Sequence, residues 1–259
     1  MCTVLIDGGA VRLGPVTVLK FGSSLLSGRD GFQQVVTEVA REVALGRRVL
    51  TVVSAMKGTT DRLWEDAHTL APRPAQRLLS VLLRTGEDAS VALLGIALVQ
   101  AGLNAHVLTA EELGLRTVGP LHDAEPIDVD LARLASCLRA HDVTVVPGFV
   151  GADESGHPSL LGRGGSDLTA LFLAERLGAE EVRLVKDVDG VFLEDPKGDG
   201  AARTALAEAT WAEVDRVGNG VVQTKALRFA EDAGLSFRVA GLAGVGTRVG
   251  PPTSVGAAP

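Results

Sequence analysis

The sequence has few aromatic residues and no tyrosine. Phe and Trp make up 3% of its 259 residues, whereas 46% of the residues are hydrophobic. Folds built only from strands usually depend on aromatic and β-branched side chains, so this composition favours helices packed on a sheet. Leucine, valine and alanine must fill the core, and the chain is long enough to bury a sizeable one.

Also missing are the groupings of cysteine and histidine that form disulfide frameworks and zinc sites. The two cysteines, Cys2 and Cys137, lie far apart, and no two of the five histidines are four residues apart. We therefore assign no residue to a metal site. No run approaches the ~20 apolar residues that span a membrane, and the N-terminus lacks the features of a secretory signal. We expect a cytoplasmic protein.

Basic residues are scarce as well, and the net charge is −7. A protein that binds nucleic acid usually carries a basic surface, so we expect no nucleic-acid partner and no membrane partner. Lysine is much rarer than arginine, five residues against twenty, so each lysine position is informative. The lysines are Lys20, Lys57, Lys186, Lys197 and Lys225.

Strand and helix patterns alternate along the chain. Short β-branched runs predict strands at Val16–Phe21, Arg48–Met56, Asn104–Ala110, Val143–Phe149, Glu181–Val188 and Ser236–Gly241. Amphipathic runs predict helices at Gly31–Leu45, Arg77–Ala101, Val129–Ala140, Ser166–Leu177 and Thr224–Ala233. This order predicts an α/β fold with a mainly parallel sheet covered on both faces. The turn-rich stretch Gly114–Asp128 predicts a hairpin or flap, and residues 251–259 predict a disordered tail.

Ligands of such folds bind at the carboxyl ends of strands, where the first candidate segment lies. Lys20 ends the first predicted strand, and Gly22, Ser23 and Ser24 follow it. Backbone N–H groups beside a lysine suit phosphate oxygens. The alternative is an ordinary turn with a solvated lysine.

The second candidate is a glycine-rich loop that opens a predicted helix. It contains Gly162, Gly164 and Gly165. Such a loop binds anions through free N–H groups and the helix dipole. Arg163 offers a bidentate clamp for a carboxylate. Asp167 has a structural alternative as the cap of the helix, but capping explains neither Arg163 nor the three glycines.

The third candidate follows the strand that ends near Lys186. Asp187 and Asp189 suit ribose hydroxyls or a phosphate-bound Mg²⁺, and Asp195 ends the segment. A plain Asp-Gly turn at Asp189 and Gly190 is the alternative.

Two further residues occupy unusual helical positions. Lys225 stands in the first turn of a predicted helix, where a cation is unfavourable to the helix dipole, yet a surface lysine explains it equally well. Glu87 stands inside an apolar helical run, and a solvated helix face is the alternative. Neither a Walker-type nor a Rossmann glycine motif occurs in the sequence.

Taken in order, these segments resemble the amino acid kinase family, and within it the catalytic domain of aspartate kinases. The resemblance covers roughly Val16 to Val249. It is carried by KFGSS (Lys20–Ser24), VVSAMKGTTDRL (Val52–Leu63), TGEDAS (Thr85–Ser90), GRGGSDLTA (Gly162–Ala170), DVDGVFLEDP (Asp187–Pro196) and VVQTKALRFAEDAGLSFRV (Val221–Val239).

The resemblance implies a three-layer α/β/α sandwich that forms one domain over residues 1–250. The acceptor would bind the N-terminal part, about 16–160, and ATP with Mg²⁺ the C-terminal part, about 161–250. The expected reaction is transfer of the γ-phosphoryl group of ATP to the side-chain carboxylate of a small amino acid, with aspartate favoured. The resemblance also implies a homodimer, and we expect no regulatory domains after the kinase domain.

The resemblance assigns roles to individual residues. The implied catalytic residues are Lys20, Asp167 and Lys225. The implied acceptor-binding residues are Ser23, Ser24, Thr60, Glu87, Arg163, Gly164 and Gly165, with Arg163 pairing a carboxylate and Glu87 the amino group. The implied nucleotide-binding residues are Gly22, Lys186, Asp187, Asp189, Gly190 and Asp195.

Several residues depart from the aspartate-kinase pattern. Ser23 replaces a glycine, Lys186 stands where threonine is usual, and Lys225 fits a GxxxxK pattern of acetylglutamate and glutamate kinases. Other acceptors therefore stay open, namely glutamate, N-acetylglutamate, a carrier-bound amino acid or a phosphate monoester. A catalytically silent nucleotide-binding or regulatory subunit is a further alternative. The central expectation is that Lys20 and Lys225 converge with residues 162–167 in one cleft.

Overall fold

The computed structural model describes residues 2–6, 9–192, 204–217 and 220–252. Asp195 and residues 253–259 of the expected tail lie outside the described residues. In the described part of the chain, no helix combines the length and the apolar composition needed to cross a membrane.

A central eight-stranded sheet organises the molecule, in the order β12-β14-β13-β11-β3-β4-β8-β5. Neighbouring strands run parallel except β13 and β14. The strands are β3 (Val16–Phe21), β4 (Arg48–Val53), β5 (Ala105–Val107), β8 (Val143–Pro147), β11 (Glu181–Val185), β12 (Glu208–Ala209), β13 (Phe237–Ala240) and β14 (Thr247–Val249). Every residue of β3 is buried, as expected for a parallel strand covered on both faces.

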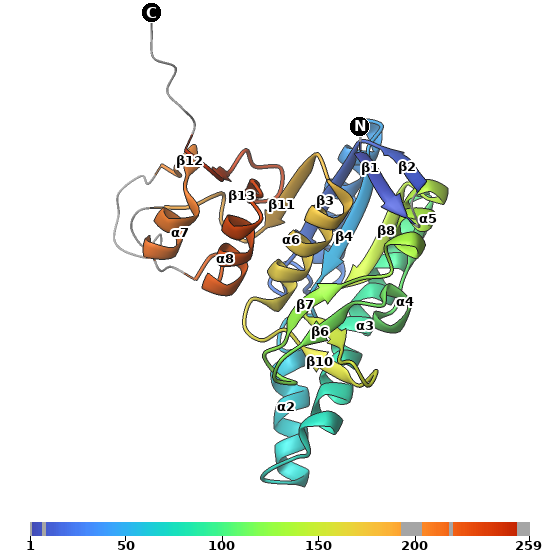
Figure 1. Ribbon diagram of the computed structural model, residues 1–259, viewed down its shortest axis with the longest axis vertical. Coiled ribbons are helices and arrows are strands. Elements are labelled where there is room, and N and C mark those ends of the chain that lie inside the picture. Colours follow the sequence, from blue (N-terminus) through green and yellow to red (C-terminus); the bar gives the residue numbers. More distant parts are fainter. Residues whose placement is uncertain (1, 7–8, 193–203, 218–219, 253–259) are drawn as a thin grey trace, which may run out of the picture.

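Helices cover both faces of this sheet, and Figure 1 shows α6 lying over the central strands. The larger helices are α1 (Gly28–Ala44), α2 (Thr59–Leu70), α3 (Gln76–Gln100), α5 (Leu131–Ala140), α6 (Gly165–Leu177) and α8 (Thr224–Asp232). One apolar core joins the sheet to α1 and α3, and another joins it to α5, α6 and α8. The expected α/β fold with a mainly parallel central sheet is confirmed.

The alternation of side chains along β3 decides which core each residue joins. Val16 and Val18 pack in the α6 core, whereas Leu19 and Phe21 pack in the α1 core. Lys20 is in phase with Val18, so its side chain takes the α6 face.

Shorter elements complete the fold. The hairpin expected within Gly114–Asp128 is present as antiparallel strands β6 (Arg116–Val118) and β7 (Glu125–Asp128). They form a second sheet with β9 (Val150–Ala152) and β10 (Pro158–Leu160). A further hairpin pairs β1 (Cys2–Ile6) with β2 (Gly9–Gly14). Among the described residues, the remaining helices are α4 (Ala110–Leu113) and α7 (Trp211–Val217).

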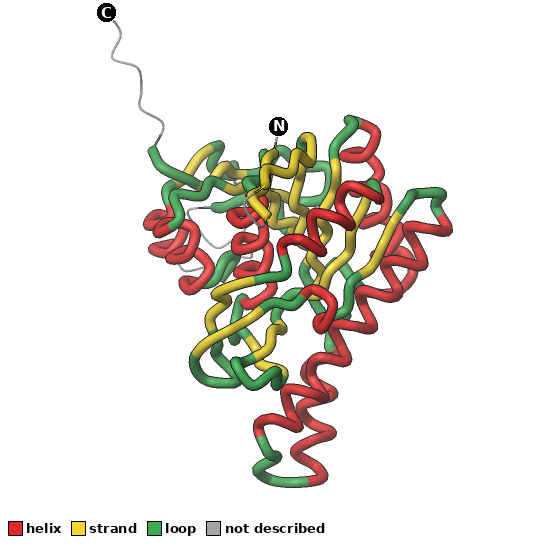
Figure 2. Tube along the Cα trace, turned by 45° about the vertical axis from the view of Figure 1, so that its right-hand side comes forward, coloured by secondary structure: helices red, strands yellow, loops and turns green. Residues whose placement is uncertain are grey.

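Two sequence predictions need correction. No helix was expected over α2, yet α2 and the first half of α3 project from the body as a helical arm (Figure 2). Within α2 only Ala67 is buried, and Leu70 is exposed, so this helix does not carry the broad apolar face that marks a core-facing helix. The strand predicted over Arg48–Met56 corresponds to β4, which already ends at Val53. The chain leaves the sheet there and lines part of a cavity.

Candidate active site

A cavity of about 370 Å³ lies where β3, β4 and β11 end and α6 begins. These three strands are neighbours and run parallel, so their carboxyl ends meet at one edge of the sheet. We call this space the active-site cavity. It is lined by Lys20, Gly22, Ser23, Ser24, Ser54, Ala55, Thr60, Glu87, Phe149, Gly162, Arg163, Gly164, Gly165, Ser166, Asp167 and Lys186.

A buried carboxylate between two lysines forms the floor of the site. Nζ of Lys20 lies 2.8 Å from Oδ1 of Asp167, and Nζ of Lys186 lies 2.7 Å from Oδ2 of the same carboxylate. Lys186 follows β11 and is in phase with Val182 and Leu184, which pack in the α6 core. Strand alternation therefore brings both ammonium groups to Asp167 in the first turn of α6.

Charge keeps Asp167 ionised despite its burial. Burial alone would raise the pKa of Asp167, but the charges of Lys186 and Lys20 outweigh it and lower the pKa to about 2. Burial lowers the pKa of Lys186, and the charge of Asp167 partly opposes that shift. The solvated-turn alternative for Lys20 is wrong, because the lysine is 6% exposed. The capping alternative for Asp167 is also wrong, since no side chain caps α6.

Glu87 reaches the same cavity from the middle of α3. It is 3% exposed, so the solvated-face alternative is wrong. Burial raises the pKa of Glu87 to about 8, although a hydrogen bond from the backbone of Ala55 and the charge of Lys20 oppose the shift. Oε2 of Glu87 is buried without a hydrogen-bond partner. A buried acceptor of this kind is costly unless a donor occupies the cavity.

Arg163 and the glycines around it also line the cavity. The guanidinium of Arg163 is exposed, and no ion pair or hydrogen bond within the described residues holds it. Gly162 and Gly164 have φ of +75° and +77°, values that side chains rarely adopt. They let the loop turn tightly into α6, whose first N–H groups have no helical acceptor of their own. The N–H of Gly165 donates to O of Gly162 at 2.9 Å, so the loop offers the cavity an unpaired cation and the N–H groups of the first turn that follow Gly165.

Lys225 lies elsewhere, which corrects the expectation that it meets Lys20 in one cleft. It lines a separate cavity of about 530 Å³ beside α8 and β7. Its Nζ donates to Oδ1 and O of Asp123 at 2.8 and 3.2 Å, to O of Ala124 at 2.9 Å and to O of Leu161 at 3.1 Å. The solvated-surface alternative does not describe it either, because these acceptors tie α8 to the segment that precedes the glycine loop.

The expected nucleotide-binding residues fall into two groups. Gly22 and Lys186 line the active-site cavity. Asp187 is exposed next to Lys186 and is not among the cavity residues. Oδ1 of Asp189 accepts a hydrogen bond of 3.0 Å from the backbone of Gly241, so this carboxylate holds a neighbouring turn. Gly190, with φ of +119°, is buried in the same region.

The sequence reading missed several cavity residues. Oγ of Ser54 donates to Oγ of Ser166 at 3.0 Å, joining the end of β4 to the start of α6. Phe149 lines the cavity with φ of +69°, and its N–H donates to Oγ1 of Thr169. Both serines stand inside motifs that carry the family resemblance, which was the available signal. Nothing in the sequence pattern indicated Phe149.

The described residues present no cluster of three or more histidine, cysteine or acidic side chains able to hold a metal ion. Both oxygens of Asp167 are engaged by lysines. The cavity therefore suits an anion such as a phosphate group directly, whereas Mg²⁺ would have to arrive on that phosphate.

Comparisons with known proteins identify the family of this chain. The sequence profile of the amino acid kinase family matches residues 15–241. An aspartokinase of Geobacillus stearothermophilus is 36% identical over 219 residues, which are 84% of this chain and 54% of that protein. The chain thus spans about half the length of the curated relatives that it matches.

Solved structures show the same relationship. The aspartate kinase of Synechocystis superposes with a TM-score of 0.76 at 28% identity, covering 92% of this chain and 40% of that one. Aspartokinase III of E. coli, in complex with aspartate and ADP, gives a TM-score of 0.74 over 93% of this chain and 65% of that one. Because the identity to aspartokinase III is 24%, this second comparison supports a shared fold and nothing more. The resemblance to aspartate kinases is confirmed, and the chain belongs to the amino acid kinase family.

Proposed function

We propose that this protein is an ATP-dependent kinase that phosphorylates the side-chain carboxylate of a small amino acid, with aspartate as the favoured acceptor. The product is an acyl phosphate. Membership of the amino acid kinase family and the aspartokinase relatives support this assignment.

One observation carries the proposal: among the described residues, the active-site cavity contains a guanidinium without an ion-pair partner and a buried carboxyl oxygen without a hydrogen-bond partner, beside two buried ammonium groups. An amino acid with an acidic side chain is complementary to this set. Its α-carboxylate pairs with Arg163, and its ammonium group donates to Oε2 of Glu87, which otherwise has no partner. Its side-chain carboxylate then faces the lysines on Asp167.

The chemistry needs positioning and charge neutralisation rather than a general base. A carboxylate acceptor is already ionised, so no proton has to leave before it attacks the γ-phosphorus. Lys20 neutralises charge on the transferring group, and Asp167 holds this ammonium in place at 2.8 Å. The N–H groups at the start of α6 supply further donors.

ATP fits the site through its phosphates. The lysines and the glycine loop offer donors to the phosphate oxygens, and Mg²⁺ bound to ATP would screen part of their charge. We assign no protein ligand to the metal ion, since the described residues contain no cluster that would hold it.

The test is an acceptor screen on the purified protein with ATP, Mg²⁺ and hydroxylamine, which traps acyl phosphates as hydroxamates. We expect hydroxamate from aspartate and a smaller or no yield from glutamate and N-acetylglutamate. ADP release with phosphate monoesters covers the remaining acceptors. Product from another acid but not from aspartate would remove the aspartate assignment, and unchanged turnover in Lys20→Ala would refute chemistry at this cavity.

We further propose that the protein forms a homodimer. The second half of α3, Ser90–Gln100, contains no charged residue. It exposes Leu93, Ile96 and Val99 by 41, 67 and 59%. An uncharged helix face can pack on its own two-fold copy without bringing like charges together. Light scattering should show a dimer for the wild type, and Ile96→Glu should shift it toward the monomer.

A further inference from the structure

Two ammonium groups in the active-site cavity share one carboxylate, although a single ammonium group would be enough to balance its charge. The side chains of Lys20 and Lys186 are 7 and 15% exposed, and both contact the single carboxylate of Asp167. One negative charge balances one lysine, so an excess positive charge faces the cavity. Burying an unbalanced charge costs free energy unless a ligand compensates it. The arrangement therefore points to a doubly contacted anion.

Lys225 is poorly placed to supply the second ammonium. An ammonium group has three N–H donors, and four oxygen atoms already surround Nζ of Lys225. One of them belongs to the carboxylate of Asp123, which balances the lysine charge. This lysine lines a different cavity from Lys20.

We propose that Lys186 is a second catalytic lysine, whose ammonium contacts the phosphoryl group during transfer together with Lys20. The proposal rests on the function proposed above. In the step, an acceptor carboxylate oxygen forms a bond to the γ-phosphorus. The bond from that phosphorus to the bridging oxygen breaks, and its electron pair leaves on ADP. Both lysines stay protonated throughout.

Geometry explains why Lys186 suits this role. Each oxygen of the Asp167 carboxylate contacts one lysine. The Nζ atoms of Lys20 and Lys186 therefore lie beside the first turn of α6, at 2.8 and 2.7 Å from the carboxylate. Charge on the transferring group spreads over its equatorial oxygens, and two flanking cations can meet two of them. A donor held in this way typically contributes about 10²–10³-fold to the rate.

The kinetic experiment compares Lys186→Met with Lys225→Met, using the acceptor that the screen identifies. We expect Lys186→Met to lower kcat about 100-fold, with the KM for ATP within fivefold of the wild type. The factor by which Lys225→Met lowers kcat should be at least ten times smaller than the factor for Lys186→Met. Arg116→Met removes an exposed cation that pairs with Asp128 away from the cavity, and it should retain wild-type kcat.

Binding measurements separate a catalytic lysine from a nucleotide-binding one, and they need no turnover. Titration calorimetry would compare ADP alone with ADP and aluminium fluoride, which mimics the transferring phosphoryl group. Lys186→Met should weaken the aluminium fluoride complex at least 50-fold and ADP alone less than fivefold. If the wild type turns over no acceptor, the proposed function fails, whereas this comparison still decides the role of Lys186.

A pH profile gives an independent reading. Burial lowers the pKa of Lys186, so the wild-type kcat should fall on the alkaline side as this lysine loses its proton. Lys186→Arg stays charged there, and its kcat should be lower at pH 7 but flat across the same range. Three results would overturn the proposal: near wild-type kcat in Lys186→Met, an equal or larger loss in Lys225→Met, or equal weakening of ADP alone and its aluminium fluoride complex.

Discussion

At the scale of single residues, Glu87 shows how a binding site opposes stability. The folded protein keeps this carboxyl buried with one oxygen unpartnered, and burial raises its pKa from 4.5 to about 8. The folded state therefore retains a proton that the unfolded chain releases between these two values. Stability falls as pH rises through that window, because the unfolded state binds fewer protons there.

Glu87→Gln should stabilise the free protein and weaken acceptor binding. A buried Glu87 must stay protonated at pH 7, which costs roughly 3 kcal/mol of folding free energy when its pKa is raised from 4.5 to about 8. A neutral amide has no such cost. Urea unfolding should show this gain near pH 8 and lose it toward pH 4.5, while the acceptor KM rises at least tenfold. Glu65→Gln, on the exposed face of α2, is the matched control and should show no such pH dependence. A destabilised Glu87→Gln at pH 8 would contradict the argument.

At the scale of elements, the junction between the glycine loop and α6 sets the geometry of the site. A Cβ on Gly164 would lie 2.5 Å from Cβ of Gln223, at the start of α8, and the backbone has φ of +77°. The loop is therefore wedged against α8. Lys225 holds the same region through O of Leu161, at 3.1 Å. α8 thus supports the loop mechanically, although its lysine does not reach the active-site cavity.

Gly164→Ala should impair both stability and turnover. Gly178 ends the same helix with φ of +61° and has no atom within 4 Å of an added Cβ, so Gly178→Ala is a matched control. The control should cost about 1 kcal/mol from backbone strain alone and keep its kcat. Gly164→Ala adds the clash with Gln223, so it should cost more in urea unfolding and lower turnover at least tenfold. Equal effects of the two substitutions on both measurements would show that the wedge is unimportant.

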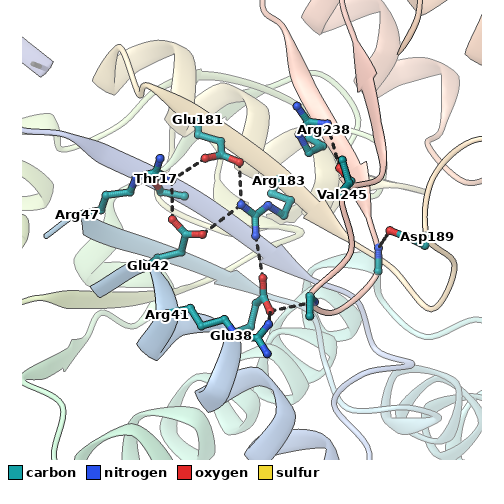
Figure 3. Close-up of polar contacts among 12 residues, drawn as sticks. Thr17, Glu38, Arg41, Glu42, Arg47, Glu181, Arg183, Asp189, Arg238 and Val245 are labelled. Atoms are coloured by element: carbon teal, nitrogen blue, oxygen red, sulfur yellow. Dashed lines mark hydrogen bonds and ion pairs between the residues drawn. The ribbon is translucent and has the colours of Figure 1, made fainter. Parts of the chain in front are cut away.

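At the scale of the whole molecule, an ionic cluster on the α1 face of the sheet joins distant segments (Figure 3). Arg183 of β11 contacts Glu38 at 2.7 Å, Glu42 at 3.1 Å and Glu181 at 2.8 Å. Glu38 also accepts the N–H of Ala243, in the turn that follows β13. The cluster therefore fixes α1, β11 and this turn relative to one another.

Arg183→Met should destabilise the fold strongly. It leaves Glu38 and Glu42, whose side chains are 3 and 5% exposed, without their shared cation. Removing one partner of a buried ion pair typically costs about 3–5 kcal/mol. The matched control Arg48→Met breaks the pair with Asp142, whose side chains are 34 and 40% exposed, and should cost about 1 kcal/mol or less. Urea denaturation measures both, and a similar loss for the two variants would contradict a structural role for the cluster.

The sequence by itself determined the order of the main strands and helices and most of the residues that line the cavity. The β-branched run Val16–Phe21 and the glycines that end the helices are local features, so they could be identified along the chain. Lys20, Arg163 and Asp167 follow strands or open a helix, and such positions meet at one sheet edge in any parallel α/β fold.

Only the tertiary structure decided which lysines share that edge. Lys186 reaches Asp167 because β11 lies beside β3 with a register that pairs Leu184 with Lys20. Lys225 is held outside the active-site cavity because Asp123 and Ala124, just before β7, and Leu161, just before the glycine loop, offer it four acceptor oxygens. Strand order and long-range acceptors leave no periodic trace in a sequence, so spacing along the chain could not distinguish these two lysines.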